Sequence, residues 1–359
     1  MMLKIIDKYI IRKFLTTFFF MLGVIMLLAM VFDLSDRLGE FLMNKAPANE
    51  IIFTYYLNFI LLYGNSFSFM IVFISVIWFT AKMAQDTEII PIWNSGKPFS
   101  RFIRPYMVGA TILVVISLII NHVVLPMSNK RSLDFEDKYY RNALSVSNYF
   151  ADFPGNQTVQ FGNYSSEENV VQQFILERFN KDNSLAYILV ARTAENVEGT
   201  NKWILKDYYQ RKIGYPKDLI EEGQQKDTVF GFKIGEMAAR DNIATAMKTN
   251  DLKKFIEREK AKGSGKIPLY ELEMYQRTAN PFATYVLTII GIAVSSQKKR
   301  GGIGVNIAIG LVIVLIYIFA MKIMAVAAEN VGFPTLIASW VPNVLFGIVA
   351  FFMYRFAQK

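Results

Sequence analysis

Uncharged stretches alternate with polar segments along the chain, and their lengths predict membrane-spanning helices. A helix needs about 20 mainly apolar residues to cross the hydrocarbon core of a bilayer, because every backbone polar group must be paired internally there. The second of six such stretches is long enough to tilt, and Gly64-Asn65-Ser66 within it is a predicted weak point. The predicted spans are residues 14–32, 51–80, 106–127, 279–297, 301–321 and 331–354.

The long polar segment between the third and fourth spans predicts a β domain. Short runs rich in Val, Ile, Phe and Tyr are separated there by turn-forming residues. Regularly spaced strands without a long helix favour a sandwich or jelly-roll type of domain. Residues 250–262 then predict a helix that leads back to the membrane. The predicted strands are residues 158–164, 170–178, 185–194, 202–213 and 228–234.

The predicted fold class is therefore an α-helical polytopic membrane protein with an inserted all-β, jelly-roll-like domain. Residues 1–127 form the N-terminal membrane half, which includes a short cytoplasmic helix at about residues 84–96. Residues 128–275 form the inserted domain with its connecting helix, and residues 276–359 form the C-terminal membrane half.

Composition and charge agree with a membrane protein. The chain is 53% hydrophobic and only 19% charged, whereas a soluble domain carries about 25% charged residues. The net charge of +9 does not indicate nucleic acid, because the basic residues sit at the ends of apolar runs and not in a cluster. The first span could also be a signal peptide, but its apolar run is long and no small-residue cleavage site follows.

The distribution of lysine and arginine predicts the orientation. Cytoplasmic loops carry an excess of these residues. Both termini and the loops after the second and fourth spans are rich in them, whereas the opposite loops carry mostly acidic residues. Both termini are therefore expected in the cytoplasm, and the inserted domain is expected outside it.

The chain lacks the residues for most catalytic and metal chemistry. It contains no cysteine and a single histidine, His122, which excludes thiolate sites and any site with several histidines. Gly263-Ser264-Gly265-Lys266 resembles a phosphate-binding loop, but the required upstream glycine and the following Ser or Thr are missing. We predict no catalytic residue, cofactor or metal, so an ATP-driven function requires a partner subunit.

A few charged residues near the ends of the spans are candidates for function. Asp33, Asp36 and Arg37 form a charge cluster at the mouth of the first span. Lys322 lies near the outer end of the fifth span, where it either snorkels to the interface or holds an anionic group. His122 is interpreted as a packed or interfacial side chain. The acidic stretch with Glu221, Glu222 and Asp227 is interpreted as a solvated loop.

The loop from Lys82 to Pro105 is too long for a turn. Its segment Asp86–Trp93 is amphipathic and predicts a short helix along the inner membrane face, ending at Asn94-Ser95-Gly96. An interfacial anchor and a docking helix for a cytoplasmic partner have the same pattern.

The chain resembles the LptF/LptG permeases of the lipopolysaccharide transport complex. The resemblance covers all six spans, and its start and gate region are more similar to the G-type than to the F-type subunit. It rests on Leu3–Ile10, Asp86–Ile90 with Asn94-Ser95-Gly96, Glu271-Leu272, Arg277, Asn280–Ala283, Lys298–Gly302 and Trp340–Asn343.

This resemblance implies a role in the export of lipopolysaccharide from a bacterial inner membrane, with the inserted domain in the periplasm. It implies a heterodimer with a second LptF/LptG-type permease, a dimeric cytoplasmic ABC ATPase and a periplasmic jellyroll bridge protein. The first and fifth spans would form a lateral gate for the lipid, with Asp33, Asp36, Arg37 and Lys322 as gate residues. Asp36 stands where the G-type subunit carries a basic residue. The ATPase-coupling residues would be Glu88, Ile89, Ile90, Ser95 and Gly96.

Other classes of function remain open on the sequence alone. A membrane-anchored sensor or mechanotransmission protein with a ligand-binding outer domain would have the same architecture. A secondary transporter is disfavoured because the spans contain hardly any ionisable residue at mid-membrane. An intramembrane enzyme is disfavoured because no nucleophile or metal constellation is present.

Overall fold

The chain forms two compact units in the computed structural model. One unit comprises residues 1–135, 245–249 and 271–359, and the other comprises residues 136–244 and 250–270. The structure describes residues 4–94, 96, 98–139, 145–153, 155–165, 170–197, 200–214, 217–231, 242–261, 264–296 and 302–357.

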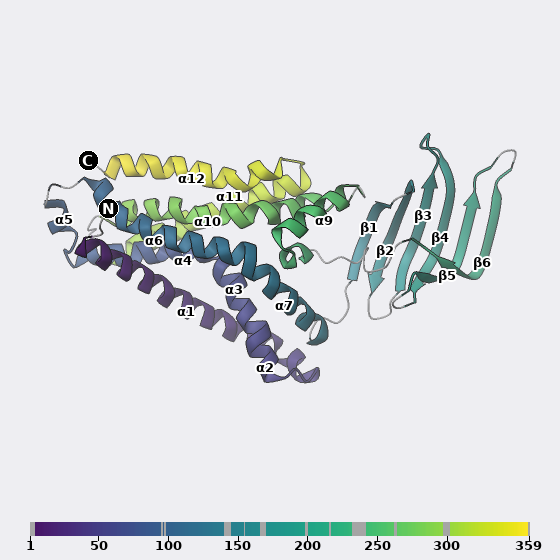
Figure 1. Ribbon diagram of the computed structural model, residues 1–359, viewed down its shortest axis with the longest axis horizontal. Coiled ribbons are helices and arrows are strands. Elements are labelled where there is room, and N and C mark those ends of the chain that lie inside the picture. The colour runs from purple at the N-terminus through teal and green to yellow at the C-terminus, as the bar shows by residue number, and fades with distance from the viewer. Residues whose placement is uncertain are drawn as a thin grey trace. The chain divides into compact units, whose positions relative to one another are not determined.

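The first unit is built from helices, and among the described residues six helical stretches are long and apolar enough to cross a membrane. This number agrees with the six predicted spans (Figure 1), but in the second only α4 has that length and apolarity, and residues 51–66 belong to shorter helices. Several helices extend well beyond the apolar runs that predicted them. The helices are α1 (Ile5–Met43), α2 (Ala48–Glu50), α3 (Leu57–Ser66), α4 (Ser68–Gln85), α5 (Ile90–Asn94), α6 (Phe99–Ile119), α7 (Leu125–Tyr139), α10 (Ile267–Ser295), α11 (Gly302–Asn330) and α12 (Thr335–Ala357).

The second and third apolar segments contain irregular helix. The second is interrupted at Phe67, between α3 and α4, which confirms the weak point predicted at Gly64-Asn65-Ser66. It also begins with a π-helix, η1 (Ile51–Tyr56). The third segment contains a π-helix, η2 (Ile120–Val124), between α6 and α7. π-helical turns are rare and occur frequently at functional sites.

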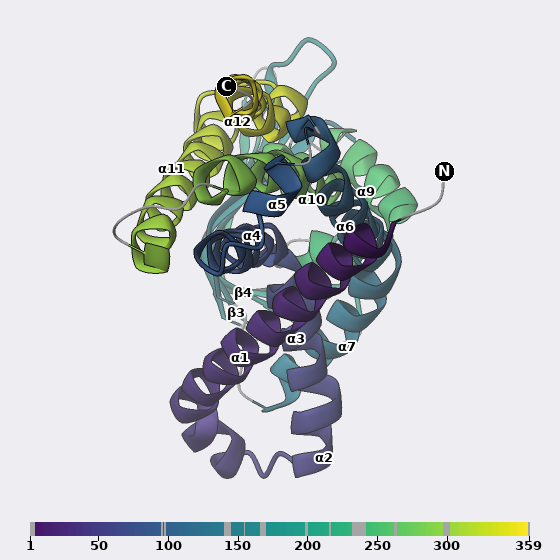
Figure 2. The same ribbon diagram turned by 90° about the vertical axis from the view of Figure 1, so that its left-hand side faces the viewer.

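The helices differ in how much of their surface is covered. In the most apolar part of α4 and of α10, 67% and 61% of the residues are buried, against 22% in both α1 and α11. Helices α1 and α11 both pack against α4, which lies between them (Figure 2). Their remaining apolar surfaces, for example at Phe20, Leu27 and Leu28 on α1, are therefore free for lipid or for another chain.

A close approach joins α1 to α6. A Cβ atom built on Gly109 of α6 would lie 2.5 Å from Cδ1 of Phe14, which is fully buried. Only glycine leaves space for this ring. Small residues allow such close helix contacts in membrane proteins.

The second unit contains the inserted β domain, which confirms the predicted fold class. Its six described strands form one antiparallel sheet in the order of the sequence. Side chains on one face build the core; Ala151, Val159, Leu176 and Leu189 are partners across four neighbouring strands, and all are buried. The strands are β1 (Ser145–Phe153), β2 (Gln157–Ser165), β3 (Val170–Phe179), β4 (Leu185–Asn196), β5 (Lys202–Lys212) and β6 (Leu219–Val229).

The strand prediction was wrong at both edges of the sheet. Residues 145–153 form a strand that we did not predict, and the acidic stretch taken for a solvated loop is the edge strand β6. Strand β6 forms by pairing with β5. Glu221 of β6 accepts a hydrogen bond from Tyr208 of β5 and another from Lys226 of β6 itself. The bond from Lys226, followed by that from Tyr208, holds the pKa of Glu221 below its usual range. The strand predicted at 228–234 ends in fact at Val229, and residues 232–234 lie outside the described part of the chain.

The predicted connecting helix is confirmed as α9 (Thr249–Ala261). Its buried positions Leu252 and Ile256 are four residues apart and therefore lie on one face.

Candidate coupling loop and gate residues

The loop between the second and third spans contains a shorter helix than predicted. Helix α4 ends at Gln85, residues 86–89 form a turn, and α5 comprises only Ile90–Asn94. The helix predicted from the amphipathic pattern of Asp86–Trp93 therefore begins four residues later than predicted, at Ile90. Thr87 interrupts it, because its φ of 61° is left-handed and incompatible with a continuous right-handed helix.

The predicted coupling residues occupy different positions on this loop. Ile89 is only 2% exposed and belongs to the core formed with α1, α4 and α6, so it anchors the loop. Glu88 is partly exposed, whereas Ile90 and Gly96 are exposed. Ser95 lies outside the described residues.

Glu88 is hydrogen-bonded to the beginning of α1. Tyr9 donates its hydroxyl hydrogen to Glu88 Oε2 at 3.0 Å, and Lys13 Nζ lies 3.4 Å from the same oxygen. Lys13 Nζ also donates to the Tyr9 hydroxyl at 2.8 Å. The carboxylate of Glu88 is 34% exposed, so it retains an open side.

A second ion pair fixes the same end of α1 to α6. Arg101 donates two hydrogen bonds of 2.7 Å, one to each carboxylate oxygen of Asp7. The Asp7 side chain is 4% exposed and that of Arg101 is 22% exposed. Removing one partner of such a buried pair costs about 3–5 kcal/mol, whereas an exposed pair contributes about 0–1 kcal/mol. This second pair was not predicted, because nothing in the sequence relates two residues so far apart.

The charge cluster near the C-terminal end of α1 is organised around Asp33. Arg37 Nε donates to Asp33 Oδ1 at 3.0 Å, and the hydroxyl of Tyr55 donates to Asp33 Oδ2 at 2.9 Å. Asp36 is exposed. Asp33 and Arg37 therefore neutralise each other in part, and Asp36 leaves this region acidic.

Lys322 of α11 is not brought to this cluster. It is exposed, and within the described parts of the chain it makes no ion pair. Because α1 and α11 lie on opposite sides of α4 (Figure 2), the predicted gate residues form two separate groups in one chain.

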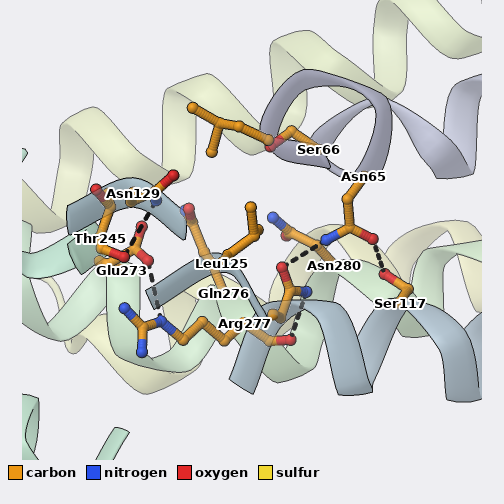
Figure 3. A pocket seen from close by; sticks show the side chains of 12 residues that line it. Asn65, Ser66, Ser117, Leu125, Asn129, Thr245, Glu273, Gln276, Arg277 and Asn280 are labelled. Carbon is orange, nitrogen blue, oxygen red and sulfur yellow. Dashed lines mark hydrogen bonds and ion pairs between the residues drawn. The ribbon is translucent and has the colours of Figure 1, made fainter. Parts of the chain in front are cut away.

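A polar cavity of about 130 Å³ lies among α3, α6, η2, α7 and α10 (Figure 3). Asn65, at the end of α3, organises one wall: it donates to Asn121 Oδ1 at 2.6 Å and accepts from Ser117 at 2.7 Å. Asn121 lies in the π-helix η2 and donates to the backbone oxygen of Arg277 at 2.9 Å. The irregular helix ends in both segments are thus joined by side-chain amides.

Arg277 organises the opposite wall of this cavity. Its guanidinium is almost fully buried, with Nε 3.0 Å from Glu273 and Nη1 2.8 Å from the backbone oxygen of Met247. Asn129, also lining the cavity, is 4% exposed, and its Oδ1 has no hydrogen-bond partner among the described residues. A cavity of this size and polarity accommodates ordered water, which would satisfy that oxygen.

His122 has a structural role beside the cavity. Its ring nitrogens lie 2.9 Å from Thr249 Oγ1 and 3.2 Å from Thr278 Oγ1. The interpretation of His122 as a packed side chain agrees with these two contacts. No group of three or more potential metal ligands occurs in the part of the chain that the structure describes.

Comparison with known proteins identifies a family. The sequence model of the family described as lipopolysaccharide export system permease LptF/LptG matches residues 8–355, which is nearly the whole chain. No curated protein matches the chain significantly.

Proposed function

Because the chain belongs to the LptF/LptG family of lipopolysaccharide export system permeases, we propose that it extracts lipopolysaccharide from the inner membrane and passes it to a periplasmic bridge protein. Members of this family are inner-membrane permease components that work together with other Lpt proteins, and they are not themselves the catalysts. The match over residues 8–355 is the observation that carries this proposal. The six apolar helices and the inserted β domain support it.

The energy for extraction comes from a separate dimeric ATPase. Removing acyl chains from a bilayer costs about 0.8 kcal/mol per CH₂ group, and the sequence has no phosphate-binding loop of its own. The inner loop offers a docking surface, because Ile90 is 48% exposed and Glu88 keeps an open side. Ile89 holds this loop in place, and Ser95 and Gly96 follow α5 in the sequence.

A second permease of the same family completes the gate. In a single chain α1 and α11 are separated by α4, and each leaves a broad apolar face uncovered. We propose that α1 of one permease meets α11 of the other, and that lipid enters between them. In this proposal Lys322 provides positive charge for the lipid phosphates, and Arg37 contributes less because it is paired with Asp33.

The orientation follows from the basic inner loops. Both termini lie in the cytoplasm in this proposal, and the β domain lies in the periplasm. There the antiparallel sheet receives acyl chains from the gate and hands the lipid to the bridge protein.

Charge reversal at the docking loop tests the proposal. We expect Glu88→Lys to uncouple ATP hydrolysis from transport, because it places a repelling charge at the ATPase contact. Lipid release from proteoliposomes that contain the complete complex, measured together with ATP hydrolysis, checks this.

Asp86→Lys is the matched control, because Asp86 is exposed in the same turn and the charge change is identical. We expect this variant to transport nearly as well as the parent protein. Normal transport by Glu88→Lys would remove Glu88 from the coupling role.

A further inference from the structure

Helix α1 connects the inner loop with the charge cluster near the opposite membrane face. It runs without interruption over 39 residues, from Ile5 to Met43. At a rise of about 1.5 Å per residue, an α-helix of this length spans about 58 Å. Its inner end carries Asp7, Tyr9 and Lys13, and its outer part carries Asp33 and Arg37. A displacement imposed at one end therefore reaches the other.

The inner end of α1 is attached firmly to the elements around the docking loop. Asp7 is held by Arg101 of α6 through two bonds of 2.7 Å, and Lys13 and Tyr9 are held by Glu88. The polar contacts are backed by an apolar core, in which Ile10 and Phe14 of α1 are buried in one cluster with Ile89. The loop thus contacts α1 directly, through polar and apolar side chains.

The outer part of α1 is attached to a different set of elements. Phe41 packs edge-on against Tyr55 of η1, with ring centroids 5.6 Å apart, and Tyr55 also donates to Asp33. The helix break at Phe67 separates η1 and α3 from α4. Phe135 of α7 packs against both Phe41 and Tyr55, so the outer part of α1 can move only together with η1, α3 and this part of α7, while α4 stays in the core.

We propose that Asp7 and Arg101 are positioning residues that make α1 a lever between the ATPase-docking loop and the gate. When the ATPase displaces the loop, the two ion pairs carry the displacement to the inner end of α1. The rigid helix then shifts Asp33, Arg37 and the attached η1–α3 segment, with the break at Phe67 as the hinge. This inference rests on the proposed function, since it requires an ATPase bound at the loop and a gate beside α1.

The absence of cysteine from the chain allows the movement to be measured with two introduced spin labels. Leu38→Cys marks the outer part of α1, and Val331→Cys marks the turn between α11 and α12; both positions are exposed. The distance between the labels is recorded in the complete complex, without nucleotide and after trapping with ATP and vanadate. We expect the distance to change between these two states.

Charge reversal then tests whether the ion pair between Asp7 and Arg101 transmits the displacement, or whether the packing of α1 against α6 is enough. In Asp7→Arg and in Arg101→Asp we expect the nucleotide-dependent change in distance to be lost, while ATP hydrolysis continues. The double variant Asp7→Arg with Arg101→Asp restores opposite charges, and we expect it to recover the change. Lys8→Glu is the control, because Lys8 is exposed on the same turn of α1, and this variant should behave like the parent.

The outcomes distinguish the lever from the function on which it rests. A full change in distance in the single variants, or no recovery in the double variant, would overturn the lever and leave the permease function intact. No change in the parent complex would overturn both the lever and an ATP-driven gate. If a single variant does not assemble, Lys13→Gln replaces it, since Lys13 is 25% exposed and contributes less to folding; an undiminished change in Lys13→Gln would also overturn the lever.

Discussion

Charged side chains in the helical unit fall into two groups with different physical consequences. Asp7 and Arg277 are each about 95% buried or more and are held by charged or backbone partners. Asp36 and Lys322 are exposed, so they remain free for a ligand or a partner. Buried charges without partners are costly, and the first group therefore fixes the structure, whereas the second group is available for function.

Substitution of Arg277 tests whether a buried charge with partners stabilises the fold. Its guanidinium holds Glu273 on its own helix and the backbone oxygen of Met247. We expect Arg277→Leu to lower the free energy of unfolding by about 3 kcal/mol, because the oxygen of Met247 loses a charged donor and Glu273 loses its counter-charge. Thermal unfolding of the purified chain in detergent measures this.

Arg131→Leu is the matched control, since Arg131 is exposed on α7. A surface substitution of this kind typically changes stability by less than about 0.5 kcal/mol. Equal effects of the two substitutions would show that the network around Arg277 contributes little.

The sequence identified the residue types at the candidate site but not their partners. Glu88 stood out because it lies in an amphipathic segment between two spans, and its resemblance to the family's coupling loop supported this. Its bonds to Tyr9 and Lys13 join residues more than 70 positions apart, and no local pattern predicts such pairs. The same holds for Asn65 and Asn121, whose hydrogen bond depends on how two helices cross.

At the scale of the elements, the spans were predictable because their cause is local. A membrane-spanning helix needs a long apolar run, and each of the six predicted runs coincides for most of its length with helix, although the second is interrupted at Phe67 and the last begins before α12. Strand β6 was not predicted, because the cause of its structure is not local. It is rich in charged and polar residues, and its structure depends on pairing with β5, which a single-sequence pattern does not contain.

The close contact between α1 and α6 leads to a prediction about the stability of the helical unit. We expect Gly109→Ala to destabilise the helical unit by about 1–3 kcal/mol, because the new methyl group would overlap the Phe14 ring and overpacking costs this much. Thermal unfolding in detergent, with the protein separated from its partners, reports the loss.

Gly23→Ala controls for the change in helix propensity, since a Cβ atom at Gly23 would meet no atom within 4 Å. This variant should unfold at nearly the temperature of the parent protein. Unchanged stability of Gly109→Ala would mean that α1 and α6 separate easily, and α1 would then be a poor lever.

At the scale of the whole molecule, helices α1 and α11 each leave most of their most apolar part uncovered. The family to which the chain belongs acts as part of a complex. We propose that partners of this complex cover these surfaces and bind at the loop that contains Glu88. The proposed function therefore depends on which proteins and lipids the chain binds in its own membrane.

The most direct test is purification of the tagged chain from that membrane in a mild detergent, with identification by mass spectrometry of everything that remains bound. The account predicts a second six-span permease, an ABC-type ATPase and an acylated, phosphorylated glycolipid in stable association with the chain. Recovery of a soluble signalling protein, with no ATPase and no glycolipid, would contradict it.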